Sequence, residues 1–338
     1  MSVFVAEELS EVLNTKVVIG RINMGLLNRI IIDDVLLDDQ SGQEMLKVTR
    51  LSAKFDIMPF FKGKISISSV QLFGFNINLR KETPDSPPNF KFVLDAFASK
   101  DTVKKENSLD LRINSILIRR GRMSYHVLSE EETPGKFNAK HIQLQNIIAN
   151  ISLKALSKDS LNLGIKRLSL DEKASGFSLK KMSLKLVANN KQTNIDNFTI
   201  ELPETSLKLD TIHLEYDSLK AFDRFTEQVH FSFRTLPSQV TLKDISPFVP
   251  ILSHFKEPVT LDMEVKGTVD QLTCSHLEIT ADDRQFRLRG DVSLQDLSHP
   301  QDAYVYGTLS ELSANTRGVG FLVRNLSPNY NGVPPLLE

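Results

Sequence analysis

Hydrophobic and polar residues alternate along most of this chain. Apolar side chains occupy every second position in a series of segments, and polar or charged side chains lie between them. The clearest examples are residues 51–57, 73–79, 161–165, 207–216 and 259–265. A period of two residues is typical of a β-strand with one apolar and one solvated face. The pattern therefore predicts a mainly β protein with a long sheet, and not a doubly wound fold of alternating helices and strands.

The alternation shifts by one residue after positions 67, 165, 179 and 209. An extra residue in one strand produces such a shift and bends the sheet. We therefore expect β-bulges or short strand breaks at these positions.

A few segments show helical signals instead. They are residues 2–13, 89–99, 217–228 and 242–255. The first is amphipathic with an acidic polar face, so we expect it to cap the open end of the first sheet; binding at a bilayer surface is the alternative. Asn89 follows two prolines and is the predicted N-cap of the helix expected at residues 89–99.

The segment TPDSPP, residues 83–88, is the predicted linker. We accordingly divide the chain into three parts. Residues 1–83 would hold the N-terminal helix and the first β unit, residues 84–100 the linker and a short helix, and residues 101–338 the continuing β repeats.

The amino-acid composition argues against several classes of binding site. The 41 Lys and Arg residues balance 42 Asp and Glu, for a net charge of −1, so the basic face that nucleic acids require is not expected. The chain has 20 Phe, 5 Tyr and no Trp, a choice that suits apolar surfaces better than sugar-binding platforms. Cys274 is the only cysteine, which excludes an internal disulfide and a cysteine-based zinc site. The sequence has no run of about 20 apolar residues that could cross a membrane as a helix.

Motifs that indicate catalysis or metal binding are absent from the sequence. The seven histidines form no HxH, HxxxH or HExxH pattern, and no phosphate-binding glycine loop occurs. Paired acids at 33–34, 38–39 and 282–283 adjoin turn-like segments, where Asp bonds to its own backbone. The basic clusters 62–64 and 119–122 are interpreted as solvated turns, with contact to anionic lipid headgroups as the alternative. We expect no enzyme activity, no metal and no cofactor.

Degenerate segments follow one another in an order that is similar to a known family. They are KVVIGRI (16–22), NRIIIDDV (28–35), LKVTRLSAKFD (46–56), KGKISISSVQL (62–72), NFKFVLDAF (89–97), LKDISPFVP (242–250) and VTLDMEVKGTVDQL (259–272). In this order they resemble the AsmA-like family, and within it the TamB (translocation and assembly module) branch of Bacteroidetes. Family members usually begin with a membrane-spanning helix and are several times longer, so we interpret this chain as an N-terminal soluble fragment.

The resemblance implies an elongated, curved antiparallel sheet that forms a U-shaped apolar groove with a few short helices. It implies a periplasmic protein, anchored in the inner membrane by a helix outside this chain, that carries phospholipid between the inner and outer membranes for outer-membrane homeostasis. A partner barrel of the TamA-like or BamA-like kind would be reached through a C-terminal region that also lies outside this chain.

Phospholipid acyl chains would contact the apolar stripes. The candidate lining residues are Ile65, Ile67, Phe73, Phe75, Ile77, Leu79, Leu161, Leu163, Ile165, Leu207, Leu209, Leu261, Met263 and Val265. The alternative is a purely structural role, in which these apolar faces only pack on each other. Two other functions stay open: a scaffold that assists assembly of outer-membrane β-barrel proteins by lending a strand edge, and a β-solenoid binding module.

Overall fold

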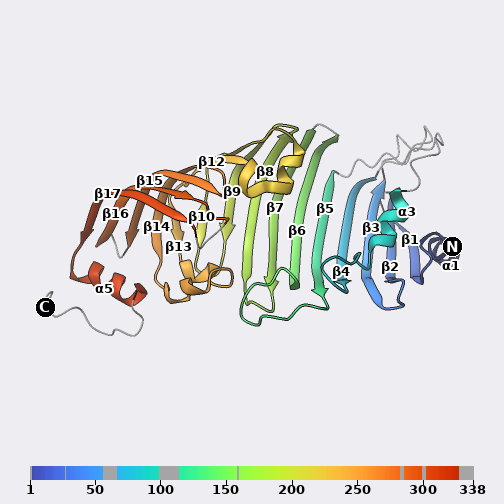
Figure 1. Cartoon of the computed structure of the whole chain (residues 1–338). Coiled ribbons are helices and arrows are strands. Elements are labelled where there is room, and N and C mark those ends of the chain that lie inside the picture. Colours follow the sequence, from blue (N-terminus) through green and yellow to red (C-terminus); the bar gives the residue numbers. More distant parts are fainter. Residues whose placement is uncertain are drawn as a thin grey trace. The chain divides into compact units, whose positions relative to one another are not determined.

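The computed structural model describes residues 2–26, 28–55, 67–98, 114–157, 160–281, 285–298 and 302–326. It is mainly β, with 59% strand and 16% helix. The 17 strands of this described part belong to one mixed sheet (Figure 1). The predicted long sheet with a few short helices is therefore confirmed. The chain divides into two compact units, unit 1 (Met1–Leu153 and Arg167–Ser178) and unit 2 (Lys154–Lys166 and Leu179–Glu338). Both predicted boundaries, at 83/84 and 100/101, lie inside unit 1.

Unit 1 begins with a helix and continues with long strands. Its elements are α1 (Ser2–Leu13), β1 (Val17–Gly25), β2 (Arg29–Asp38), β3 (Glu44–Phe55), β4 (Ile67–Lys81), α3 (Lys91–Ala98), β5 (Ser115–Val127) and most of β6 (His141–Ser157), with the second half of β7 (Ser160–Glu172). Strands β1 to β4 pair with their sequence neighbours in antiparallel hairpins.

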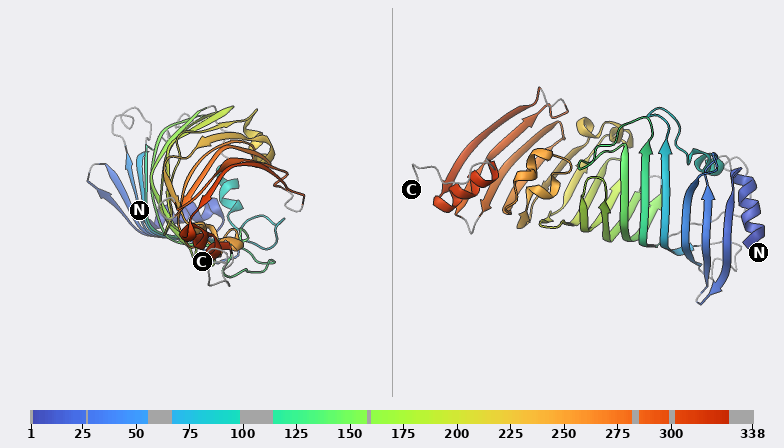
Figure 2. Two further views of the ribbon diagram at one scale, coloured as in Figure 1. Left: turned by 90° about the vertical axis from the view of Figure 1, so that its left-hand side faces the viewer. Right: turned by 90° about the horizontal axis from the view of Figure 1, so that it is seen from below.

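Unit 2 contains shorter strands with helical turns between them. Its elements are the first half of β7, β8 (Ser178–Asn189), β9 (Gln192–Glu201), β10 (Ser206–Lys208), β11 (Ile212–Glu215), η2 (Leu219–Arg224), α4 (Phe225–Gln228), β12 (His230–Arg234), β13 (Ser238–Val240), η3 (Leu242–Ile245), η4 (Pro250–His254), β14 (Val259–Gly267), β15 (Gln271–Ala281), β16 (Phe286–Gln295), β17 (Tyr304–Ala314) and α5 (Thr316–Leu326). The helical segments predicted at 217–228 and 242–255 are confirmed as short, interrupted turns. Helix α5, which lies against β16 and β17 (Figure 2), was not predicted.

We expected the sheet to be antiparallel throughout, but one pair of neighbouring strands is parallel. Strand β4 pairs with β5 in parallel, from Ser69 opposite Ser115 to Lys81 opposite Val127. Parallel neighbours cannot be joined by a tight hairpin and need a crossover connection. The crossover is the stretch between β4 and β5, and it contains α3. Alternation along a strand carries no information about the direction of its neighbour, so the sequence pattern missed this pair.

A row of left-handed residues crosses unit 1. Asp34, Gly74, Arg120 and Asn146 have φ angles of 56°, 64°, 56° and 54°. They lie at neighbouring register positions of β2, β4, β5 and β6, with Thr49 of β3 between the first two. Asp, Gly and Asn adopt this conformation more readily than other residues, whereas Arg120 is strained in it. One such residue in an extended strand changes the side on which the following side chains lie.

The predicted shifts in alternation have mixed outcomes. The break after residue 209 is confirmed, because β10 ends at Lys208 and β11 begins at Ile212. Between β8 and β9 the register changes at Ser183/Lys185, later than the predicted position after 179. The shift after 67 is confirmed, because Phe55 pairs with Ile67 while Lys54 pairs with Ser69, which leaves Ser68 as an extra residue in β4. The shift after 165 stays a prediction.

Helices cover one part of the apolar face of unit 1. Its buried residues are Ala6, Val17, Ile19, Leu37 and Met45. Side chains from α1 and from the start of the α3 region pack against them, namely Val5, Leu13, Phe90, Phe92 and Val93. We call these residues the covered patch. Figure 1 shows α1 beside β1 and α3 close to the same strands. The helix predicted at 2–13 thus exists and packs on the first strands of the sheet.

Candidate functional site

The apolar face of unit 1 continues beyond the covered patch. Val48, Phe75 and Ile147 are its buried residues. The partly buried residues around them are Val35, Leu46, Leu51, Leu72, Ile77, Ile118, Met123, Leu144 and Leu170. All of these lie on strands β2 to β7, so no helix of the described part contributes to the cluster. We call it the open patch.

Among the described residues, no second layer of the kind that usually buries a sheet face contributes to the open patch. In a β-sandwich an opposing sheet lies about 10 Å away and covers such side chains. Here every described strand belongs to the same sheet, and most of the patch is only half-buried. Extended apolar surfaces are rare on soluble proteins and usually mark a binding site. The patch is therefore the first candidate for a functional surface.

Two of the predicted lining residues belong to the open patch. Phe75 is buried, and its ring covers Gly121, whose missing Cβ would lie 2.4 Å from the ring. Ile77 packs against the same cluster and is half-buried. Leu79 is half-buried and lines a cavity of about 330 Å³ further along β4. Ile65 lies outside the described residues; Ile67 begins β4, and its side chain is not described.

The alternation predicted that Phe73 and Phe75 lie on the same apolar face, but they do not. The Phe73 side chain is 39% exposed, and the Arg120 guanidinium lies 5.1 Å from the centre of its ring. Leu72 packs in the open patch instead. The cause is Gly74, whose positive φ reverses the two sides of the strand between these residues. A glycine inside a strand pattern is a known sign of such an irregularity, so the sequence did contain a signal.

The predicted lining residues of unit 2 are spread over several strands. Leu161, Leu163 and Ile165 on β7, Leu207 on β10, and Leu261 and Met263 on β14 are half-buried, whereas Leu209 and Val265 are buried. The β14 residues face apolar partners on β15, with Leu261 opposite Ile279 and Met263 opposite Leu277. Leu209 instead makes an isolated bridge to Thr235.

Part of the apolar face in unit 2 is covered. Phe321 of α5 packs on Phe286 and Ala281, with Leu288 and Ile279 beside them. A cavity of about 760 Å³ lies nearby, lined by Val259, Leu261 and Ala281 together with polar residues such as Glu278. Unit 2 therefore also has apolar surface at a cavity, but α5 limits its extent.

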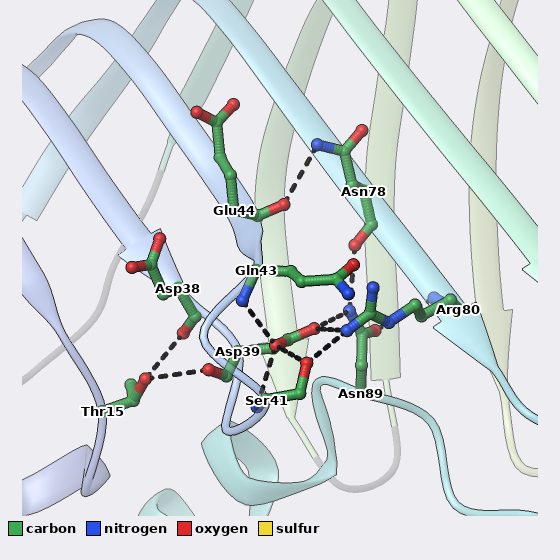
Figure 3. A network of polar contacts seen from close by, with 9 residues as sticks. All are labelled: Thr15, Asp38, Asp39, Ser41, Gln43, Glu44, Asn78, Arg80 and Asn89. Atoms are coloured by element: carbon green, nitrogen blue, oxygen red, sulfur yellow. Dashed lines mark hydrogen bonds and ion pairs between the residues drawn. The ribbon is translucent and has the colours of Figure 1, made fainter.

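A polar network holds the crossover against the strand ends of unit 1 (Figure 3). Asp39 is 2% exposed, and its Oδ1 accepts hydrogen bonds from the Ser41 N–H at 3.0 Å, the Ser41 hydroxyl at 2.7 Å and the Gln43 N–H at 3.1 Å. Its Oδ2 accepts from Arg80 Nη2 at 2.7 Å and from Asn89 Nδ2 at 3.2 Å. Burial alone would raise the pKa of Asp39. These hydrogen bonds and the Arg80 charge lower the pKa by more than burial raises it, so the net shift is downward.

The same network corrects the predicted role of Asn89. Its amide also accepts a hydrogen bond from the Arg80 N–H at 3.0 Å and donates to the Asn78 carbonyl at 3.1 Å. Helix α3 begins only at Lys91. Asn89 is therefore no N-cap; it fastens the crossover to β4. The network closes the wall of a cavity of about 660 Å³ beside α1 and α3, and because its groups are mutually paired we assign it a structural role.

Two further carboxylates, the buried Asp33 and the half-buried Glu278, are held as anions by their partners. Asp33 accepts a 2.6 Å hydrogen bond from Arg50 Nε, which lowers the pKa of Asp33. Hydrogen bonding and charge from Arg289 likewise lower the pKa of Glu278 in unit 2. A carboxylate with a lowered pKa is a poor proton donor near neutrality. These groups are hence suited to pairing charges across strands and not to acid catalysis.

None of the helices in the described part has the length and hydrophobicity needed to cross a membrane. No protein-family model matches the chain, and the search of curated proteins finds no match either.

Proposed function

We propose that this chain binds lipid acyl chains on the apolar face of its sheet and serves to carry phospholipid between two membranes of a cell envelope. The observation that supports the proposal is the open patch, in which strand residues alone form a continuous apolar surface. The resemblance to the TamB branch of the AsmA-like family adds the periplasm as the proposed compartment.

The energetics favour an acyl chain as the ligand. Each buried CH₂ group contributes roughly 0.8 kcal/mol, so ten methylenes on the patch would contribute about 8 kcal/mol before the entropy of binding is subtracted. A stripe of Leu, Ile, Val and Met side chains has no polar atom to orient a ligand, so it allows a chain to slide. The headgroup remains in water and needs no pocket of its own.

The test compares two faces of the same strands. In the variant Ile77→Gln/Met123→Gln, two register neighbours of the open patch become polar. Phe73→Gln is the matched control, because Phe73 lies outside the patch. Native mass spectrometry of protein purified from cells, and transfer of a fluorescent phospholipid between vesicles, measure binding and carriage. We expect the double variant to lose lipid at least tenfold and the control to keep it.

Two results would contradict the proposal. One is wild-type protein that carries no lipid and accelerates no transfer. The other is equal loss in the patch variant and the Phe73→Gln control, because binding would then not depend on the open patch. Far-ultraviolet circular dichroism of each variant shows whether the fold is kept.

A second candidate function is supported by β17. This strand pairs with β16, and no described strand pairs with its other edge. Its side chains Tyr304, Val305, Tyr306, Leu309 and Leu312 are 56–68% exposed. Exposed edges accept an added strand from another protein, so we consider a scaffold for assembly of β-barrel proteins as the alternative.

Replacing a residue on the edge separates the two functions. Val305→Pro would disturb strand addition at β17 without touching the open patch. If the scaffold function holds, this variant no longer captures an unfolded β-barrel substrate but still carries lipid. Unchanged capture would exclude the edge as the site.

A further inference from the structure

Two histidines face each other where strands β5 and β6 leave their connecting loop. His126 is directly opposite His141 in the register. Their Nδ1 atoms are 3.0 Å apart. Glu132 in the loop places its Oε1 4.0 Å from His126 Nδ1, and the ligand atoms of all three residues lie within 4.8 Å of one another. The residues are distant enough in sequence that no spacing motif connects them.

The buried histidine has a defined tautomer. His141 is 6% exposed, and its Nε2 lies 2.9 Å from the Glu130 carbonyl oxygen. A carbonyl can only accept, so Nε2 carries the proton and the neutral ring has its lone pair on Nδ1. That lone pair is directed at His126. Histidines that bind metals commonly donate their second N–H to a carbonyl in this way, which orients the ring.

The loop that carries Glu132 is organised by its own hydrogen bonds. Asn138 donates to the Glu131 carbonyl at 3.1 Å and accepts from the Lys140 N–H at 2.9 Å. The Lys140 ammonium pairs with the Glu130 carboxylate at 2.7 Å. Glu130 is thus neutralised by a lysine, and Glu132 is the carboxylate that faces the two rings.

We propose that His126, His141 and Glu132 bind a divalent transition-metal ion of the Zn²⁺ class. The two Nδ1 atoms and one carboxylate oxygen would be the protein ligands, with water in the fourth position. Two imidazoles and a carboxylate suit Zn²⁺ better than Mg²⁺ or Ca²⁺, which prefer oxygen ligands alone.

The geometry requires only small movements. Zinc–nitrogen bonds of about 2.0–2.1 Å in a tetrahedral site separate two nitrogens by roughly 3.3 Å, a few tenths more than the 3.0 Å here. The Glu132 side chain is 61% exposed and free to approach. The proton that His126 Nδ1 shares with His141 moves to His126 Nε2 when the metal binds.

Such a site would join the ends of β5 and β6 to their loop. Ligands that bind the native state alone stabilise it, so Zn²⁺ should raise the melting temperature of unit 1. This inference does not depend on the proposed lipid binding.

The experiment uses the whole chain, purified in the presence of chelator and then freed of it. Calorimetric titration with Zn²⁺ gives the affinity, and Co²⁺ gives the visible absorption of a tetrahedral site. His126→Gln should weaken Zn²⁺ binding about 100-fold and Glu132→Gln about tenfold, with loss of the cobalt bands in the first. His213→Gln is the control, because His213 contacts Asn194 and Glu215 but no second imidazole.

Two results would overturn the site. One is a Zn²⁺ affinity of the wild-type protein that is no higher than that of the His126→Gln variant. The other is loss of Zn²⁺ binding in the His213→Gln control while the His126→Gln variant still binds Zn²⁺. Glu132 is exposed, so Glu132→Gln keeps the test valid if His126→Gln proves unstable. An unaltered Zn²⁺ affinity and cobalt spectrum in that variant would exclude the carboxylate.

Discussion

The covered patch and the open patch of unit 1 consist of similar side chains in different surroundings. In the covered patch, α1 and residues Phe90, Phe92 and Val93 add a helical layer over β1 to β3. In the open patch, Val48, Phe75 and their neighbours all come from strands. Both arise from the same alternation of apolar and polar residues. The second layer, and not the strand pattern, therefore decides whether an apolar face is a core or a surface for a ligand.

Among the substitutions considered for the two patches, we expect replacement of Phe75, the buried aromatic side chain of the open patch, to destabilise the protein most. Phe75→Ala removes the ring that covers Gly121 and leaves a cavity among Val48, Ile147 and their neighbours. We expect a loss of about 3–5 kcal/mol in the free energy of unfolding, measured in urea. A loss below about 1 kcal/mol would show that the patch has no packed centre.

Asp39→Asn should loosen the crossover that brings the helical layer to the covered patch. The variant keeps the shape of the side chain but removes the charge that faces Arg80, and we expect about 2–3 kcal/mol of destabilisation at pH 7.

The pH dependence of that effect has a definite sign. The pKa of Asp39 is lower in the folded protein than the value of about 3.9 in an unfolded chain. Its contribution is therefore complete above about pH 4 and is lost as the pH falls through the folded pKa. The difference between wild type and Asp39→Asn in urea unfolding should shrink below pH 4. A difference that grows on acidification would contradict the assignment.

A matched pair of substitutions tests whether the two patches differ in lipid binding. Phe92→Gln lies in the covered patch and Leu51→Gln in the open patch. Both side chains are half-buried, so each variant should lose about 1–2 kcal/mol of unfolding free energy. Only Leu51→Gln should reduce the binding of a fluorescent fatty acid. Equal binding in the two variants would remove the distinction between the patches.

The smallest effect is expected at Phe73. Its ring is partly exposed beside Arg120 and belongs to neither patch. Phe73→Ser should change the unfolding free energy by about 1 kcal/mol or less and leave lipid binding unchanged. If lipid binding falls as strongly as in Leu51→Gln, the stripe predicted from simple alternation would be the relevant one.

The β character of the chain and the places of most helices follow from local patterns in the sequence. Period-two alternation is a local property, because neighbouring side chains on a strand must lie on opposite sides. Residues 2–13 form a helix for an equally local reason, the spacing of Val5 and Leu13. The break between Leu209 and Ile212 was also visible as a change of phase.

Local sequence does not specify which residues share a face or which strands are neighbours; long-range contacts do. A single left-handed residue such as Gly74 exchanges the two sides of a strand, so Leu72 replaces Phe73 beside Phe75. The parallel pairing of β4 with β5 joins strands that a crossover separates in sequence. The approach of His126 to His141 likewise depends on the register of two strands. These arrangements follow from long-range hydrogen bonding and packing, which no window of local sequence contains.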